Sequence, residues 1–367
     1  MKKYILTLFI LFNIVASCDN TETDLIGPSY DRSTLLKNWY NQHINIGLSV
    51  FKNKVDMVGE MIDLIKSEKS IASLVKLREE HLTAWKAWQK IEMFNIGKAE
   101  EIYFKSKMNV YPVNTARVES NVSSGSYDLS NANNFAAQGF PALDYLLYGI
   151  GSNDEEILEK YTNDDRYLDY IKAVTDEMIS SSEKVINDWE TYKNEFLNST
   201  DNNATSAVNL MVNDFIYYYE KGFRANKFGI PGGVFSSVPL PENVEDYFGR
   251  LNSNPLALEA FDAIQAFYEG KNLTTGVTYS GASLRSIITD LDTKEGSDNL
   301  GNKISEKLKA AREKIVKLDQ SFVNQIQSNN NKFLQTYDAI QEVVVLLKVD
   351  MLQLLSINVD YVDADGD

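Results

Sequence analysis

Residues 31–66, "DRSTLLKNWYNQHINIGLSVFKNKVDMVGEMIDLIK", decide the fold class of this chain. Apolar side chains recur in it at steps of mostly three, four or seven residues: Leu35, Trp39, Ile46, Val50, Val55, Val58, Ile62 and Ile65. Such steps place side chains along one stripe of an α-helix. Because a helix this long can bury its stripe only against other helices, the segment predicts a helical bundle.

The same periodicity continues along most of the chain. Residues 70–96 repeat it through Leu74, Leu77, Trp85, Trp88 and Ile91. Further helices are predicted over residues 154–198, 203–227, 255–269, 283–292, 303–329 and 331–357. Alternation with a period of two is nearly absent, so we predict an all-α protein. We expect two packed helical bundles, residues 31–197 and 207–357, joined by the polar linker "NSTDNNATS" at 198–206.

Two segments interrupt the helical pattern and are rich in turn residues. They are "NVYPVNTARVESNVSSGSYDLSNANN" at 109–134 and "FGIPGGVFSSVPLPENVEDYFG" at 228–249. We predict both as long loops. Loops of this length in a compact domain are usually either functional or disordered, so both are candidates for a binding site.

The chain begins with "MKKYILTLFILFNIVASC", which has the pattern of a secretory signal peptide. Its end, "VASC", matches a lipobox, so we expect Cys18 to carry lipid, residues 19–30 to form a tether, and the chain to be anchored to a membrane. An ordinary signal peptide with an incidental cysteine is the alternative. We predict a location in the cell envelope, at the outer membrane, and the sequence leaves open whether the chain faces the periplasm or the cell exterior.

The charge balance excludes one class of partner. Asp and Glu number 52 against 36 Lys and Arg, which gives a net charge of −16. Such an excess argues against binding a polyanion, so no nucleic acid partner is expected. The end of the chain, residues 358–367, is predicted as an acidic tail, because it stops before it could supply the last acid of a calcium loop.

Histidine chemistry is scarce. The chain has two histidines, His43 and His81, and neither begins a metal-binding spacing. His81 shares a helix face with Trp85 and Trp88, which favours a buried, hydrogen-bonded histidine over a ligand or a base. Motifs of zincins, serine hydrolases and phosphate-binding loops are missing.

Two polar groups remain as candidate ligand-binding residues. One lies in "YPVNTARVES" (111–120) and comprises Tyr111, Asn114, Arg117 and Glu119, which either are solvated or face a site. The other is the series Lys221, Arg224 and Lys227, which either pairs with neighbouring acids or holds an anion.

Several segments together resemble the imelysin family of bacterial envelope proteins: "LREEHLTAWKAWQKIEMFNIGKAE" (77–100), "YPVNTARVES" and "QGFPALDYLLYG" (138–149). The resemblance implies a pair of helical bundles, often lipid-anchored. The family is classed with metallopeptidases, although many members are better described as iron-regulated or iron-uptake proteins. Its G-x-H-x-x-E motif falls on residues 139–144, which begin with Gly139 and hold Pro141 at the histidine position and Asp144 at the glutamate position.

These two departures weaken the case for metal chemistry. Proline has no lone pair to offer a metal, and aspartate is one methylene shorter than glutamate, so the motif supplies at most one ligand. Pro141 does suit the first position of a short helix that would end at Gly149, and a longer, kinked helix is the alternative. Asp144 is then either a helix-end acid or a ligand, and Glu119 is the acid proposed to join it at a metal.

We therefore expect a non-catalytic envelope lipoprotein, linked to iron acquisition, that binds a small ligand or a metal-bearing species in a cleft between its bundles. Gly139, Pro141, Asp144, Arg224 and Lys227 are expected at that cleft with the 111–120 group, and iron or another divalent metal is the candidate cofactor. One alternative is a metallopeptidase with a non-standard ligand set that includes Glu119 and His81. Another is a surface module that recognises an envelope protein or a glycan.

Overall fold

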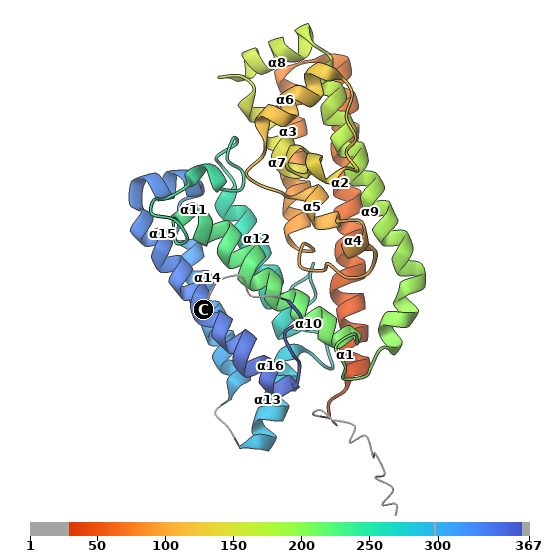
Figure 1. The fold of residues 1–367 in the computed structure, drawn as a ribbon, viewed down its shortest axis with the longest axis vertical. Coiled ribbons are helices and arrows are strands. Elements are labelled where there is room, and N and C mark those ends of the chain that lie inside the picture. The colour runs from red at the N-terminus through yellow and green to blue at the C-terminus, as the bar shows by residue number, and fades with distance from the viewer. Residues whose placement is uncertain (1–28, 297–298, 362–367) are drawn as a thin grey trace, which may run out of the picture.

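The structure is a computed structural model that describes residues 29–296 and 299–361 (Figure 1). The predicted signal peptide and Cys18 lie outside these ranges, as do parts of the tether and the acidic tail. The described chain is helical and has no β-strand, only an isolated bridge between Lys271 and Thr278. The prediction of an all-α protein with two packed bundles is confirmed.

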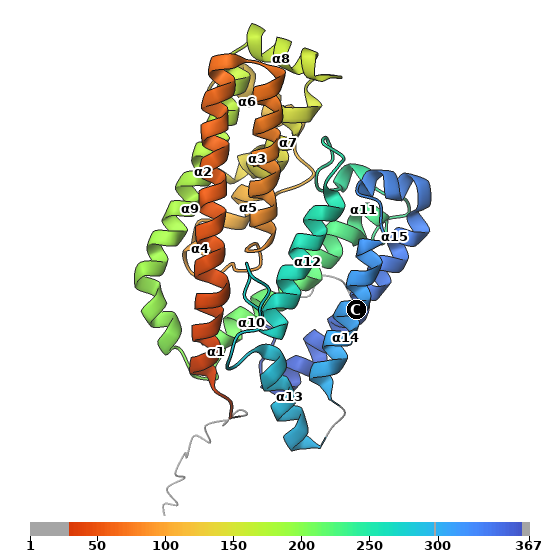
Figure 2. The same ribbon diagram turned by 180° about the vertical axis from the view of Figure 1, so that it is seen from behind.

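The first bundle is built on three long helical segments. They are the continuous run of α1 (Arg32–Trp39), η1 (Tyr40–Ile44) and α2 (Asn45–Glu68), then α3 (Ile71–Gln89), then α9 (Arg166–Asn198). Helix α2 packs along both α3 and α9 (Figure 2). Six of the eight residues of the predicted stripe are buried, and Ile46 and Val50 are partly buried. Trp88 packs against Phe51 and Phe104 at ring distances of 5.3 and 5.2 Å.

Short helices fill the side of this bundle between α3 and α9. They are α4 (Lys98–Glu101), α5 (Phe104–Met108), α6 (Thr115–Ser124), η2 (Ala132–Ala137), α7 (Gly139–Asp144), η3 (Tyr145–Gly149) and α8 (Asp154–Asn163). Helix α7 contacts α3, α5 and α9, so the family motif lies inside the bundle rather than on its surface.

The second bundle lies beside the first (Figure 1). Its elements are α10 (Ala207–Tyr217), η4 (Tyr218–Gly229), α11 (Ile230–Gly232), η5 (Pro241–Asn243), α12 (Ser253–Glu269), α13 (Leu284–Glu295), α14 (Leu300–Val316), α15 (Phe322–Val345), η6 (Leu346–Met351) and α16 (Leu352–Leu355). Helix α14 packs on α12, α13 and α15, and α12 also packs on α3 of the first bundle. Among the described helices, none combines the length and apolar composition needed to cross a bilayer.

The prediction of an unbroken loop over 109–134 was wrong. Helix α6 occupies its middle, because Asn114 caps the helix by accepting a hydrogen bond from Arg117 N (3.0 Å) and Gly125 ends it with a φ of +62°. Val118 and Val122, one turn apart, bury its inner face. The N-cap, the apolar pair and the C-terminal glycine were local signals for a helix.

Two predicted helices are each broken in the structure. Residues 154–198 form α8 and α9, because the Asp164 carboxylate accepts a hydrogen bond from Arg166 N (3.1 Å) and pairs with the Arg166 guanidinium, so the chain turns there. Residues 303–329 break after α14, where Ser321 caps α15 by accepting a bond from Asn324 N (3.3 Å). Asparagine, aspartate and serine side chains compete with the helix for backbone partners in this way.

Candidate functional site

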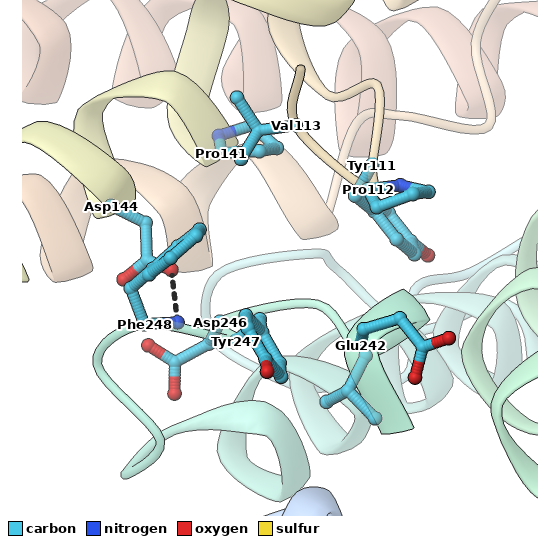
Figure 3. A pocket seen from close by; sticks show the side chains of 10 residues that line it. Tyr111, Pro112, Val113, Pro141, Asp144, Glu242, Asp246, Tyr247 and Phe248 are labelled. Atoms are coloured by element: carbon cyan, nitrogen blue, oxygen red, sulfur yellow. Dashed lines mark hydrogen bonds between the residues drawn. The ribbon is translucent and has the colours of Figure 1, made fainter. Parts of the chain in front are cut away.

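A pocket of about 230 Å³ lies where the two bundles meet, and both contribute to its wall (Figure 3). The first bundle supplies Tyr111, Pro112, Val113, Pro141 and Asp144, and the second supplies Glu242, Val244, Asp246, Tyr247 and Phe248. The pocket thus joins the loop before α6, the motif helix α7 and the segment after η5. Of the predicted site residues, it brings together Tyr111, Pro141 and Asp144.

Gly139 fixes the position of α7. The helix begins at Gly139, so the predicted start at Pro141 was wrong. Gly139 has a φ of +73°, and a Cβ there would lie 2.1 Å from the Met108 carbonyl oxygen, so only glycine allows this close approach to α5. Pro141 falls in the first turn of α7, where a backbone N–H has no intrahelical partner, so proline costs no hydrogen bond.

Asp144 joins α7 to the second bundle through backbone hydrogen bonds. Its Oδ2 accepts from Phe248 N (2.9 Å; Figure 3), and its Oδ1 accepts from Gly249 N (3.0 Å). The side chain is buried. Burial raises the pKa of the Asp144 carboxyl to about 7, against the opposing effects of the two amide donors and the Arg78 charge.

Asp246 places a second buried carboxyl beside Asp144. Its Oδ2 accepts from Leu251 N (2.9 Å) and Asn252 N (2.6 Å), which holds the turn that follows. A Cβ built on Gly249 would lie 2.6 Å from Asp246 Oδ1 and 3.0 Å from Asp144 Oδ1, so both carboxyls lie against the same glycine. Burial and the Asp144 charge raise the pKa of Asp246 well above its usual range.

Glu245, which precedes Asp246 in the sequence, belongs to a buried polar network next to the pocket segment. It pairs with Lys227 at 2.5 Å and accepts from Gln89 (2.8 Å) and Asn109 (2.7 Å). The Asn109 amide also donates to Glu92 (3.2 Å). This network connects α3 and the chain after α5 to η4 and the pocket segment, so it ties the two bundles together.

The family is settled by comparison with known proteins. The imelysin sequence model matches residues 53–349, most of the chain.

The chain belongs to the imelysin family.

Two solved structures share the fold of this imelysin chain. One is a putative iron-regulated protein A precursor from Parabacteroides distasonis ATCC 8503, with a TM-score of 0.73, 14% identity, and coverage of 90% of this chain and 96% of that one. The other is an imelysin-like protein from Psychrobacter arcticum 273-4, with a TM-score of 0.67, 15% identity, and coverage of 92% and 100%. At these identities the likeness shows the fold alone. No curated protein matches the chain significantly.

The motif residues of this imelysin chain do not fit a metal held by the protein. Pro141 has no donor atom, and both oxygens of Asp144 accept backbone hydrogen bonds. The Glu119 carboxylate lies on α6 and accepts from the hydroxyls of Tyr145 (2.6 Å) and Tyr167 (2.7 Å). Within residues 29–296 and 299–361, no three His, Cys, Asp or Glu side chains gather as metal ligands would. The predicted metal pair of Asp144 and Glu119 gains no support.

The other predicted ligand-binding residues have structural contacts or lie outside the pocket wall. Asn114 caps α6, and the Arg117 side chain is exposed. Arg224 is buried, donates to Tyr337 (2.6 Å) and lies 3.7 Å from Glu220, while Lys227 pairs with Glu245. Of the two alternatives for these cations, pairing with acids is the one that the structure shows.

His81 lies directly behind the motif. Its Nε2 is 3.2 Å from the Phe140 carbonyl oxygen, and its ring packs 5.2 Å from Trp85. Burial lowers the pKa of His81 to about 4, so the imidazole is neutral at neutral pH and Nε2–H donates to that carbonyl. His81 therefore stabilises the position of α7 through its hydrogen bond to Phe140, which agrees with the prediction of a buried, hydrogen-bonded histidine.

The residues that sequence reasoning did not name lie in "PENVEDYFG" (241–249). The segment was predicted only as part of a long loop, yet it supplies Glu242, Asp246, Tyr247 and Phe248 to the pocket and Glu245 to the network. Its signal was a cluster of acids followed by two aromatic residues in an otherwise turn-rich stretch.

Gly139→Ala tests the close approach of α7 to α5, with Gly125→Ala as its matched control. Both glycines have a positive φ, so each substitution should cost about 1–2 kcal/mol of unfolding free energy. Only at Gly139 does the new Cβ meet backbone, which should cost a further 1–3 kcal/mol or so. Urea unfolding measures both. Equal losses in the two variants would contradict the account.

Asp246→Asn tests the buried carboxyl pair by its pH dependence. A carboxyl whose pKa is higher in the folded chain takes up protons on folding, so Asp246 makes the unfolding free energy fall as pH rises above about 4, the ordinary carboxyl pKa, toward its raised pKa in the folded chain. Asparagine keeps an acceptor for the Leu251 and Asn252 amides and tolerates the φ of +63° at this position.

The variant should therefore gain stability relative to the native chain as pH rises through that window, in urea unfolding at a series of pH values. Glu242→Gln, at an exposed acid of the same pocket, should show no such trend. A difference between Asp246→Asn and the native chain that stays constant with pH would contradict the raised pKa.

Proposed function

We propose that this chain is a non-catalytic, ligand-binding imelysin of the bacterial cell envelope, anchored through lipid on Cys18. The observation that carries the proposal is the pocket between the bundles, with the motif helix on one wall and the acidic segment 241–249 on the other. Pockets at the junction of two units are a common place for ligand sites. The π-helical segments η3 and η4 contact residues of its wall, through Tyr145 on Phe248 (4.9 Å) and Lys227 on Tyr111 (5.9 Å), and such segments are frequent at functional sites.

The ligand is small. The pocket volume of about 230 Å³ is below the range of roughly 300–1,000 Å³ typical of drug-sized ligands. A pocket of this volume suits a small metabolite or a metal-bearing species. Such a species must bring its own metal ligands, because the described pocket residues supply too few. One structural neighbour carries the name iron-regulated protein A, and we extend that link to this chain as a role in iron acquisition.

A peptidase role is the weaker alternative. Metal-dependent hydrolysis needs an ion, usually held by three protein ligands, that polarises the carbonyl and activates water. Pro141, the engaged oxygens of Asp144 and the tyrosine-bound Glu119 do not provide such a set.

Val113→Trp tests whether the pocket is the ligand site. Val113 is partly buried and lines the pocket, so a tryptophan there should fill the space and leave the fold intact. In a thermal-shift screen of metabolites and iron chelates, a compound that raises the melting temperature of the native chain should lose its effect in this variant.

Val75→Trp, at a residue of α3 that is 40% exposed, is the control and should keep the full shift. Circular dichroism confirms that both variants are folded. A shift that is undiminished in Val113→Trp would place the ligand elsewhere and remove the proposed function.

Cys18→Ser tests the lipid anchor. The native chain, expressed in a bacterium with lipoprotein processing, should incorporate labelled fatty acid and sediment with membranes, and the variant should do neither. Incorporation of label by the variant would refute the anchor at Cys18.

A further inference from the structure

We propose that the pocket takes a small organic cation, an amine or guanidinium carried on an apolar body, and that Asp246 is its charged contact. This inference rests on the proposed function, since it names the class of ligand that the pocket holds. It is carried by the charges, free acceptor atoms and aromatic rings of the described pocket residues.

Of the three acids that line the pocket, the two buried ones, Asp144 and Asp246, form no ion pair with the described residues, although the Arg78 charge acts on Asp144. Asp144 is 2% exposed and Asp246 is 4% exposed, and no ion pair found in the described part of the chain includes either. Neighbouring cations are engaged elsewhere. Arg78 donates to Leu147 O (2.7 Å) and pairs with Asp154 (2.8 Å), and Lys227 pairs with Glu245. Burial raises the pKa of both carboxyls because neither has an ion-pair partner, and a ligand cation beside them would favour the ionised form.

One oxygen of the Asp246 carboxyl, Oδ1, accepts no hydrogen bond from the described residues. Both oxygens of Asp144 accept backbone hydrogen bonds, whereas Asp246 uses only Oδ2. No described residue donates to Asp246 Oδ1, although the side chain is almost fully buried and lines the pocket. Gly249 lies against this oxygen and has no Cβ to cover it. An N–H of an ammonium or guanidinium group satisfies this oxygen and its charge together.

The remaining wall suits the body of such a ligand. Tyr111, Tyr247 and Phe248 present aromatic rings, which pack against apolar groups. Protein cations already lie over two of these rings, Lys227 over Tyr111 at 5.9 Å and Arg250 over Tyr247 at 5.1 Å, so the rings serve the apolar body of the ligand. Within the described residues, the hydroxyls of Tyr111 and Tyr247 donate to no side chain or backbone group. An anionic ligand would instead meet the repulsion of Glu242, Asp144 and Asp246. A bare metal ion needs several ligands, and no three His, Cys, Asp or Glu side chains of the described residues gather to hold one.

Three probes of the same shape and different charge test the proposal on the unmodified chain. Benzylamine is the cation, benzyl alcohol its neutral counterpart and benzoate its anion, each titrated by calorimetry at about pH 8. Because burial raises the pKa of Asp246, binding of the cation is coupled to release of the proton that this carboxyl holds. Benzylamine should bind at least about tenfold more tightly than the alcohol, and benzoate most weakly of the three. Because no variant is involved, this comparison does not depend on whether a substitution folds.

Asp246→Asn then assigns the contact. It should weaken benzylamine binding by about tenfold or more and leave benzyl alcohol nearly unchanged, since only the charge contact is lost. Glu155→Gln, at an exposed acid of α8 outside the pocket wall, should change either affinity by no more than about twofold.

The outcomes separate this inference from the function on which it rests. Equal binding of amine and alcohol, stronger binding of benzoate, or no binding of any probe overturns the cation assignment. So does benzylamine binding that survives Asp246→Asn intact. In each case the pocket still stands as a ligand site if the Val113→Trp screen finds a compound of another class. Only a failure of that screen removes the proposed function itself.

Discussion

The arrangement of the site depends on the carboxylate of Asp144, which accepts the backbone amides of Phe248 and Gly249 across the junction of the bundles. When both oxygens of a buried carboxylate accept backbone N–H groups, the two hydrogen bonds together fix the distance and the orientation of the carboxylate relative to that backbone. Gly139 determines the position of Asp144, because it allows α7 to pack directly against the backbone of Met108. In this imelysin, Asp144, at the glutamate position of the family motif, thus has the structural role of linking the two bundles.

A second set of contacts, made by Glu245, holds segment 241–249 in place. Glu245 is neutralised by Lys227 and bound by Gln89 and Asn109, so the chain before Asp246 is anchored in the interior. The adjacent acids Glu245 and Asp246 therefore have different roles. One is paired and structural, and the other, Asp246, is left beside the pocket without a protein cation. Removing a partner from such a buried network costs more than its hydrogen bonds are worth, because the remaining groups stay unsatisfied.

Periodicity in the sequence was enough to predict the all-α class and the long helices, since their apolar stripes record which faces are buried. It was not enough to predict where they break, because Asp164 and Ser321 act through single side-chain contacts. At the site, the motif alignment located Asp144 and showed that Pro141 cannot bind metal. The partner segment 241–249 could not be paired with it, because contacts between residues about one hundred positions apart leave no periodic trace.

Anomalous diffraction from crystals soaked in iron and in zinc salts tests the central claim most directly, that Asp144 joins the bundles and does not bind metal. The account predicts hydrogen bonds from Phe248 N and Gly249 N to both oxygens of Asp144, with no anomalous peak within bonding distance of that carboxylate. A peak coordinated by Asp144, with either amide released from its oxygen, would contradict it.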